Sequence, residues 1–479
     1  MNYSIIIYII GCILKLEGVF MLLPCATALI YKEETGFSFL ITMALCFLAG
    51  FPLTMKKPAK KAFYTKEGFV TVALSWIVLS IMGSLPFMLS GSIPHPVDAL
   101  FETVSGFTTT GASILNDVEC LSHCVLIWRS FTHWIGGMGV LVFILSLLPL
   151  TGGYHMNLMK AESPGPSVGK LVPKVQSTAK ILYSIYIVLT LLQLILMLAG
   201  KMPFFDALCT AFGTAGTGGF GIKNSSIAEY STYLQVVITI FMILFGINFN
   251  VYFFLITKKF AQAFKFEEVR YYLGIIASAI LIITFNVRHM FGGLGEALQQ
   301  SSFQVASIIT TTGFATTDFN QWPQVSRTIL VLLMFIGACA GSTGGGIKVS
   351  RLVILCKTVR KELHLYLHPN AVKKIKMDQK AIPHEVVRST NIFLVVYVII
   401  FVASVFLIAF DNLDLTSNFT AVAATLNNIG PGLELVGPTS NFSIFSYFSK
   451  CVLIFDMLAG RLEIFPLLLL FVKDTWKKF

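Results

Sequence analysis

The chain has 479 residues, of which 55% are hydrophobic and only 12% are charged. A soluble domain usually carries about 25% charged residues, so this composition excludes an ordinary soluble protein and indicates a membrane protein. The net charge of +11 does not indicate a nucleic-acid-binding protein, because the basic residues collect in alternate connections between apolar segments.

Ten apolar segments are predicted to be membrane-spanning helices. About 20 residues of helix cross a hydrocarbon core of roughly 30 Å, and a helix pairs its own backbone groups in lipid. Two of the segments contain charged residues, namely the first and the last. The predicted spans are residues 3–30, 37–55, 69–90, 130–150, 181–200, 231–257, 271–287, 328–347, 389–410 and 445–472.

The distribution of Lys and Arg predicts the orientation of these spans. Five segments hold 26 of the 35 basic residues, and they are residues 56–66, 160–180, 258–270, 348–388 and 473–479. The positive-inside rule places such segments in the cytoplasm. Both termini are therefore expected to be cytoplasmic, which agrees with an even number of spans.

Four segments between the spans share one layout on the opposite side. Each has an apolar, helix-like run that ends in a Gly-containing turn, and the first two runs begin with Asp-Ala-Leu at Asp98 and Asp206. The turns end at Gly111, Gly219, Gly313 and Gly430, at intervals of 108, 94 and 117 residues. The third run is about one helical turn longer. The fourth matches only in placement, with Ser417 and Asn418 as the expected helix caps.

This spacing predicts an all-α polytopic membrane protein built from four fused helix–pore loop–helix repeats around one pseudo-fourfold pore. Spans one and two would form an extra N-terminal unit. The predicted units are residues 1–60 for the N-terminal two-helix unit, 61–160, 161–262 and 263–375 for the first three repeats, the third with an intramembrane loop, and 376–479 for the fourth repeat.

The turns have the chemistry of a cation pore. Non-helical backbone at membrane depth is tolerated where it lines a wet cavity or is buried in protein, and rings of carbonyl oxygens can replace the water shell of an ion. Neither Asp nor Glu lies within two residues of the four glycines, which favours a weakly hydrated monovalent cation over a divalent one. The alternative is that these small residues only pack helices together.

Two further features lie inside predicted spans. Residues 337–348 carry a Gly-rich run that should break the eighth span. It is interpreted as a flexible segment that obstructs or clears the pore, or as a kinked helix packed on a neighbour. Arg461 is a charge within the tenth span, which usually faces a cavity or a partner. It would either form an electrostatic barrier to cations or pair with Glu463, Asp456 or carbonyls freed by the broken span.

Three other patterns carry weaker signals. His364 and His368 lie four residues apart in a basic stretch, which favours a solvated helix, so no transition-metal site is expected. Cys120 and Cys124 share one loop and could pair or remain free thiols. Ser130 and His133 lie one turn apart, but the sequence places no carboxylate to orient the histidine, which argues against a hydrolase.

At several of these motifs the chain resembles the Trk/Ktr/HKT superfamily of K⁺ transporters, most closely its bacterial TrkH/TrkG branch. The motifs run through nearly the whole chain and are Thr108-Thr-Thr-Gly-Ala112, Gly218-Gly-Phe220, Thr310-Thr-Thr-Gly-Phe314, Asn427-Asn-Ile-Gly-Pro-Gly432, His133-Trp-Ile-Gly-Gly-Met-Gly139, Gly341-Ser-Thr-Gly-Gly-Gly-Ile-Lys348 and Ala459-Gly-Arg461.

The resemblance implies K⁺ transport by a non-enzyme without a cofactor, in the bacterial plasma membrane, as a homodimer with one pore per subunit. It implies a cytoplasmic, TrkA-like nucleotide-binding regulatory subunit. The residues that it assigns to K⁺ binding in the selectivity filter are Thr109, Thr110, Gly111, Thr217, Gly218, Gly219, Thr311, Thr312, Gly313, Asn428, Ile429 and Gly430. The residues that it assigns to the gate are Gly341, Ser342, Thr343, Gly344, Gly345, Gly346 and Arg461.

Two transport modes fit these features. The first is a channel-like, K⁺-selective uptake protein that is gated by the Gly-rich loop under the control of the regulatory subunit. The second is a symporter that couples K⁺ to H⁺ or Na⁺. A symporter needs a second ion site, and no carboxylate in the four turns suggests one.

Overall fold

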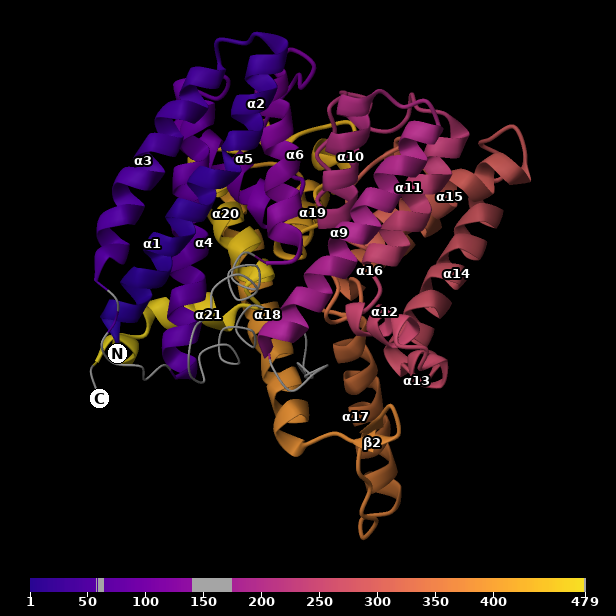
Figure 1. Ribbon diagram of the computed structural model, residues 1–479. Coiled ribbons are helices and arrows are strands. Elements are labelled where there is room, and N and C mark those ends of the chain that lie inside the picture. The colour runs from indigo at the N-terminus through magenta and orange to yellow at the C-terminus, as the bar shows by residue number, and fades with distance from the viewer. Residues whose placement is uncertain (57, 59–63, 140–174, 478–479) are drawn as a thin grey trace.

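The computed structural model describes residues 1–56, 58, 64–139 and 175–477, and it is helical apart from one short hairpin (Figure 1). The second half of the predicted span 130–150 and most of the basic segment 160–180 lie outside the described residues. Six described helical segments are long and apolar enough to cross a membrane, and the bent pair formed by α11 and α12 would make a seventh. The chain is therefore a polytopic, helical membrane protein.

The N-terminal unit contains α1 (Tyr3–Phe20), α2 (Leu22–Tyr31) and α3 (Gly36–Met55). The first predicted span thus consists of two consecutive helices. Glycines allow α1 and α3 to pack closely, because a β-carbon on Gly11 would lie 2.7 Å from the Leu53 side chain and 3.1 Å from the Gly50 oxygen. Close contact between small residues is a common way for helices to associate in lipid, where apolar surface alone provides little driving force.

Each predicted repeat contains a central helix of 12 to 16 residues between two other helices. In chain order the helices of the first two are α4 (Thr65–Leu89), α5 (Pro96–Phe107), α6 (His123–Gly137), α9 (Val175–Ala199), α10 (Phe204–Gly216), α11 (Thr232–Phe245), α12 (Phe249–Ile256) and α13 (Phe260–Phe264). Those of the last two are α14 (Glu267–Val287), α15 (Leu294–Ile309), α16 (Gln324–Ile336), α17 (Val349–Leu367), α18 (His384–Ile408), α19 (Leu415–Leu426), α20 (Tyr447–Arg461) and α21 (Phe465–Leu468). A β-hairpin of β1 (Lys376–Met377) and β2 (Lys380–Ala381) precedes α18.

Besides the first, three predicted spans differ from single long helices in the described residues. The span 231–257 bends by 92° between α11 and α12. The span 328–347 ends as a helix at Ile336, as the Gly-rich run predicts, and α17 begins only at Val349. The span 445–472 ends as a regular helix at Arg461 and continues as the short helix α21. Helices of 13 to 15 residues are about 20 Å long, so α6, α16 and α20 do not cross a bilayer by themselves.

The four short helices α5, α10, α15 and α19 have 12, 13, 16 and 12 residues, so the third is one turn longer, as predicted. The expected caps of the fourth are wrong. Asp414 is the N-cap, and its carboxylate accepts a hydrogen bond of 2.9 Å from the Ser417 N–H, while Ser417 and Asn418 lie inside the helix. An ionised cap at a helix N-terminus is favourable because it faces the positive end of the helix dipole.

The two termini and the described basic segments lie toward one end of the molecule (Figure 1). The Tyr3 hydroxyl donates to the Trp476 carbonyl over 2.7 Å, and Lys66 Nζ donates to the Asp474 carbonyl over 2.9 Å. The helices α12, α13 and α17 extend toward the same end. This grouping is the one that the positive-inside rule requires.

Candidate functional site

The four short helices end in the same backbone geometry. In each, one residue in the left-handed region follows the helix, and the next N–H bonds back to a carbonyl five residues earlier, at 2.8 to 2.9 Å, which is the long hydrogen bond of a Schellman cap. The residues with positive φ are Thr109, Thr217, Thr311 and Asn428, and the bonds run from Thr110 to Ser105, Gly218 to Gly213, Thr312 to Ser307 and Ile429 to Ala424. The fourth segment, weakest by sequence, therefore matches the others in backbone conformation.

Three of these left-handed residues are threonines, which is uncommon. A left-handed conformation costs a residue with a β-carbon roughly 1–2 kcal/mol, and such strain is found mostly where the surrounding structure enforces it for function. Two residues later, each of the four turns has a second residue with positive φ. These residues are Gly111, Gly219, Gly313 and Gly430. Glycine adopts this conformation without a steric penalty.

Each of these four glycines packs against the next repeat, and the four contacts together close a ring. A β-carbon added to any of them would lie less than 3.0 Å from the carbonyl oxygen that precedes the glycine of the next repeat. The pairs are Gly111 with the oxygen of Gly218, Gly219 with that of Thr312, Gly313 with that of Ile429, and Gly430 with that of Thr110. The structure thus brings eight of the twelve residues that the resemblance assigned to the filter into one closed ring, with one backbone oxygen from each repeat.

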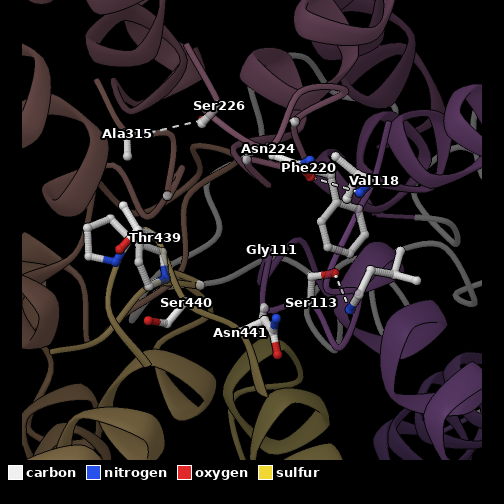
Figure 2. A pocket seen from close by; sticks show the side chains of 18 of the residues that line it. Gly111, Ser113, Val118, Phe220, Asn224, Ser226, Ala315, Thr439, Ser440 and Asn441 are labelled. Carbon is white, nitrogen blue, oxygen red and sulfur yellow. Dashed lines mark hydrogen bonds between the residues drawn. The ribbon is translucent and has the colours of Figure 1, made fainter. Parts of the chain in front are cut away.

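The segments that follow the ring are joined in the same cyclic order, and Figure 2 shows two of the bonds, Ala315 with Ser226 and Val118 with Asn224. At least one hydrogen bond of 2.8 to 3.2 Å connects each pair of neighbouring repeats. For one bond of each pair, the donors and acceptors are Val118 N–H to Asn224 Oδ1, Ala315 N–H to Ser226 Oγ, Glu434 N–H to Asn320 Oδ1 and Phe442 N–H to the Ser113 carbonyl. These segments and all four ring glycines line a cavity of about 170 Å³.

A buried ion pair supports the first two turns from behind. Glu102 on α5 and Arg129 on α6 are both at most 2% exposed, with 2.9 Å between Nε and Oε1. Glu102 also accepts hydrogen bonds from Ser113 and from the Ile114 N–H, and Arg129 donates to the Gly221 carbonyl over 3.2 Å. Because its polar groups are paired, this network can hold both turns in place without leaving an uncompensated buried charge.

His133 is bound to backbone through both ring nitrogens. Its Nδ1 lies 2.8 Å from the Gly106 carbonyl, and its Nε2 lies 3.3 Å from the Phe220 N–H. The ring therefore donates from Nδ1 and accepts at Nε2, and it joins the end of α5 to the second turn. This arrangement leaves neither nitrogen free to act as a base for Ser130, which supports the sequence argument against a hydrolase.

The Gly-rich loop 337–348 lies against the other side of the ring. The Gly345 N–H donates a hydrogen bond of 2.6 Å to the Thr311 hydroxyl. A β-carbon on Gly344 would lie 2.9 Å from the Thr310 carbonyl, and one on Gly345 would collide with the Asn427 carbonyl. The loop thus contacts residues that precede the ring, whereas the cavity of about 170 Å³ is lined by the ring glycines and the residues after them.

Three basic side chains donate to carbonyl oxygens of this loop, and the first of them, Arg351, donates from Nη1 to the Ile347 carbonyl over 3.2 Å. Lys348 Nζ donates to the Gly344 carbonyl. Arg461 donates from Nη1 to the Thr343 carbonyl over 2.9 Å, and from Nη2 to the carbonyls of Gly136 and Gly137 at the end of α6. Among the alternatives for Arg461, the described partners are therefore carbonyls, including one from the broken span.

The carboxylates expected as alternative partners of Arg461 bind elsewhere. Glu463 forms an ion pair with Arg351. Asp456 accepts a hydrogen bond of 2.7 Å from the Ser404 hydroxyl. Cys120 and Cys124 are both free thiols. The rings of His364, in the last turn of α17, and His368, its C-cap, lie 4.9 Å apart.

Sequence reasoning missed Glu268, which holds both flanks of the loop. Its side chain is 3% exposed, and Oε1 accepts hydrogen bonds from the N–H groups of Ala340 (2.7 Å) and Ser350 (3.0 Å). Its neighbour Glu267 pairs with Lys357 over 2.5 Å and donates its N–H to Asp378 of the hairpin over 2.7 Å. The only signal in the sequence was the acidic pair Glu267 and Glu268 at the start of α14. That pair does not reveal which N–H groups Glu268 binds.

These features define a helical, polytopic membrane protein in which four short helices converge on one ring of backbone oxygens. Residues 35–478 match the model of the TrkH family, described as a cation transport protein. The chain is 36% identical to the Trk system potassium uptake protein TrkH of Salmonella typhimurium, over 100% of both chains, and 33% identical to TrkG of Escherichia coli, over 99% of both. The chain therefore belongs to the TrkH family.

A solved structure agrees with this assignment. The crystal structure of the potassium transporter TrkH from Vibrio parahaemolyticus superimposes with a TM-score of 0.89 and 33% sequence identity, over 100% of both chains. The fold of the described residues is thus the fold of that transporter, and the relatives support potassium uptake as the general activity of the family.

Proposed function

We propose that the chain conducts K⁺ across the plasma membrane of a bacterium, in a channel-like manner, through the ring formed by the four turns. The observation that carries the proposal is the ring itself, in which each repeat contributes a backbone oxygen that packs against a glycine with positive φ in the neighbouring repeat. Carbonyl oxygens can replace the water around an alkali cation. K⁺ is the cargo in this proposal, and no cofactor takes part.

The filter comprises the twelve residues at the four turns, and the C-terminal ends of α5, α10, α15 and α19 converge on it. Each helix C-terminus carries a partial negative charge of about half an elementary charge. Four such ends stabilise a cation that has left bulk water, without the carboxylate ring that would favour a divalent ion.

The loop 341–346 is the proposed gate. It contacts the ends of α15 and α19 immediately before the ring, and Lys348 and Arg461 hold two of its carbonyls. In this arrangement Arg461 also sets a positive charge close to the ion path, which opposes cations while the loop is in place. Displacement of the loop would remove both obstacles together.

Regulation is proposed to come from a cytoplasmic, nucleotide-binding subunit, with the transporter itself a homodimer and both termini cytoplasmic. The basic end of the molecule, which includes α17 and the hairpin, offers a docking surface for such a subunit. The contacts of Glu267 with Lys357 and Asp378 connect that end to the loop through one pair of adjacent residues.

The test is ion flux in liposomes that contain the purified chain and either K⁺ or Na⁺ as the only permeant cation. The proposal expects flux with K⁺ and a reversal potential that follows the K⁺ gradient alone. A reversal potential that also moves with a H⁺ or Na⁺ gradient would show coupled symport instead. Equal flux of K⁺ and Na⁺ would contradict a K⁺-selective ring.

A further inference from the structure

A second cavity, distant from the ring, lies at the end of the molecule that carries the termini. It has a volume of about 710 Å³ and is lined by α17, the segments on both sides of the hairpin, and the first turns of α18. Figure 1 shows these elements extending from the rest of the helices. Its volume is within the roughly 300–1,000 Å³ typical of small-molecule sites.

The walls of this cavity carry an excess of positive charge. Lys361, Lys373, Lys374 and Arg388 line it, together with a single acidic residue, Glu362. Glu362 lies 3.8 Å from Lys361. Within the described part of the chain, Lys373, Lys374 and Arg388 have no carboxylate within 4.0 Å, and all three are exposed.

A neighbouring lysine shows the contrast. Lys357, one turn earlier on α17, binds Glu267 over 2.5 Å and the Lys376 carbonyl over 2.8 Å. Lys357 therefore connects α17 both to α14 and to the hairpin. The three cations in the cavity have no such structural task in the described residues, so their charge remains available to an anion.

The cavity adjoins a helix that is long and apolar enough to span the membrane. Residues His384–Asp411 form one apolar span, and Asn391 and Ile392 of its third turn line the cavity. Further along the same helix, Val395 and Ile399 are 58% and 61% exposed. They lie three and seven residues after Ile392, so the three share one helix face. A molecule whose anionic group lies in the cavity can therefore place an attached acyl chain along that face.

We propose that this cavity binds the phosphate headgroup of an anionic phospholipid from the leaflet on the basic side of the membrane. Basic pockets at the ends of spans are suited to anionic headgroups, with about 1 kcal/mol of attraction for each nearby Lys or Arg. The lipid-facing helix next to the charges favours a lipid over an acidic protein segment, which would need no apolar surface. The site does not depend on ion conduction.

The test is native mass spectrometry of the full chain in detergent, titrated separately with phosphatidylglycerol and phosphatidylcholine of the same acyl chains. The wild type should retain phosphatidylglycerol in preference to phosphatidylcholine. The variant Lys373→Gln/Lys374→Gln should bind phosphatidylglycerol roughly 10- to 30-fold more weakly. Arg388→Gln alone should show a smaller loss in the same direction.

The matched control is Lys258→Gln/Lys259→Gln, which removes the same charge from exposed residues outside the cavity. This control should bind phosphatidylglycerol as the wild type does. Equal weakening in both double variants would overturn the proposal in favour of general surface charge. Displacement of the lipid by submillimolar glycerol 3-phosphate would overturn it in favour of a free phosphoester, because that probe carries the phosphate without acyl chains.

Discussion

The Gly345 N–H and the Thr311 hydroxyl form a hydrogen bond of 2.6 Å that joins the Gly-rich loop to the third turn of the ring. Thr311 is one of the three threonines with positive φ, so the bond connects the loop to a residue that is itself strained. The two proposed elements, filter and gate, are therefore in direct contact. Single substitutions at the contacting residues can test whether the two elements are coupled.

Removing that acceptor should release the loop. In Thr311→Val the Gly345 N–H loses its partner, and an unsatisfied buried donor costs about 1–3 kcal/mol. We expect the loop to leave its position more often and ⁸⁶Rb⁺ flux without a regulatory subunit to rise roughly tenfold. Flux into liposomes measures this. Thr311→Ser, which keeps the hydroxyl, is the control. Equal flux in both variants would show that this hydrogen bond does not contribute to gating.

Adding one side chain to the ring should reduce selectivity. In Gly111→Ser or Gly313→Ser the new β-carbon meets the carbonyl of Gly218 or Ile429, so at least one ring oxygen must move. We expect the K⁺/Na⁺ selectivity ratio to fall by roughly tenfold, the equivalent of about 1.4 kcal/mol. Competition of Na⁺ with ⁸⁶Rb⁺ uptake measures the ratio.

Gly91→Ser is the matched control for this change. Gly91 also has positive φ, at +73°, but a β-carbon there meets nothing within 4 Å. Backbone strain alone should therefore leave selectivity unchanged in this variant. If Gly111→Ser and Gly313→Ser behave like Gly91→Ser, the assignment of the filter residues is wrong.

Truncating Glu268 should alter gating and leave selectivity intact. Glu268→Ala removes the acceptor of two N–H groups at the flanks of the loop, and hydrogen bonds to a charged group are worth about 1.5–3 kcal/mol each. We expect a lower melting temperature and a changed open probability in single-channel recordings, with an unchanged K⁺/Na⁺ ratio. Glu268→Gln keeps an acceptor and should be milder. An open probability like that of the wild type in Glu268→Ala would exclude a role in the gate.

The connection between α2 and α6 should weaken in acid. Burial raises the pKa of Glu33, but hydrogen bonds from the N–H groups of Cys124 and His123 outweigh it and lower the pKa below its usual value. A lowered pKa in the folded state contributes stability above the unfolded pKa, and this contribution is lost as pH falls through the folded pKa.

The measurement is the melting temperature of wild type and Glu33→Gln in detergent across pH 3 to 7. The wild type should be the more stable at pH 7. The difference should shrink below about pH 4, near the ordinary pKa of a glutamate. A difference that stays constant over the whole range would show that ionisation of Glu33 does not contribute.

The sequence predicted the general fold because lipid imposes simple rules on length, apolarity and charge. The long apolar helices, the break at 337–348 and the longer α15 could be read from residue types. The caps of α19 could not, since Asp414, Ser417 and Asn418 are all good cap residues and only the helix start decides among them. The bend after Phe245 was missed because residues 231–257 are uncharged and long enough for one span, although Gly246 and Asn248 interrupt the apolar run.

The four glycines of the ring were located from the sequence, but the left-handed turn that all four segments share was not. The left-handed conformation of Thr109, Thr217, Thr311 and Asn428 follows from tertiary packing, since local preference would place glycine there. In the same way, nothing in the sequence connects Glu268 to Ala340 and Ser350, which are 72 and 82 residues away.

Glu267 and Glu268 share a peptide bond but face different parts of the molecule. The first is bound to the hairpin and α17, and the second to the flanks of the loop. A protein that binds the hairpin and displaces it would also displace Glu267, which is bound to Asp378. The adjacent Glu268 would then move as well. A regulatory partner would thus need no contact inside the membrane, because a displacement outside the bilayer reaches the conduction path across a single residue step.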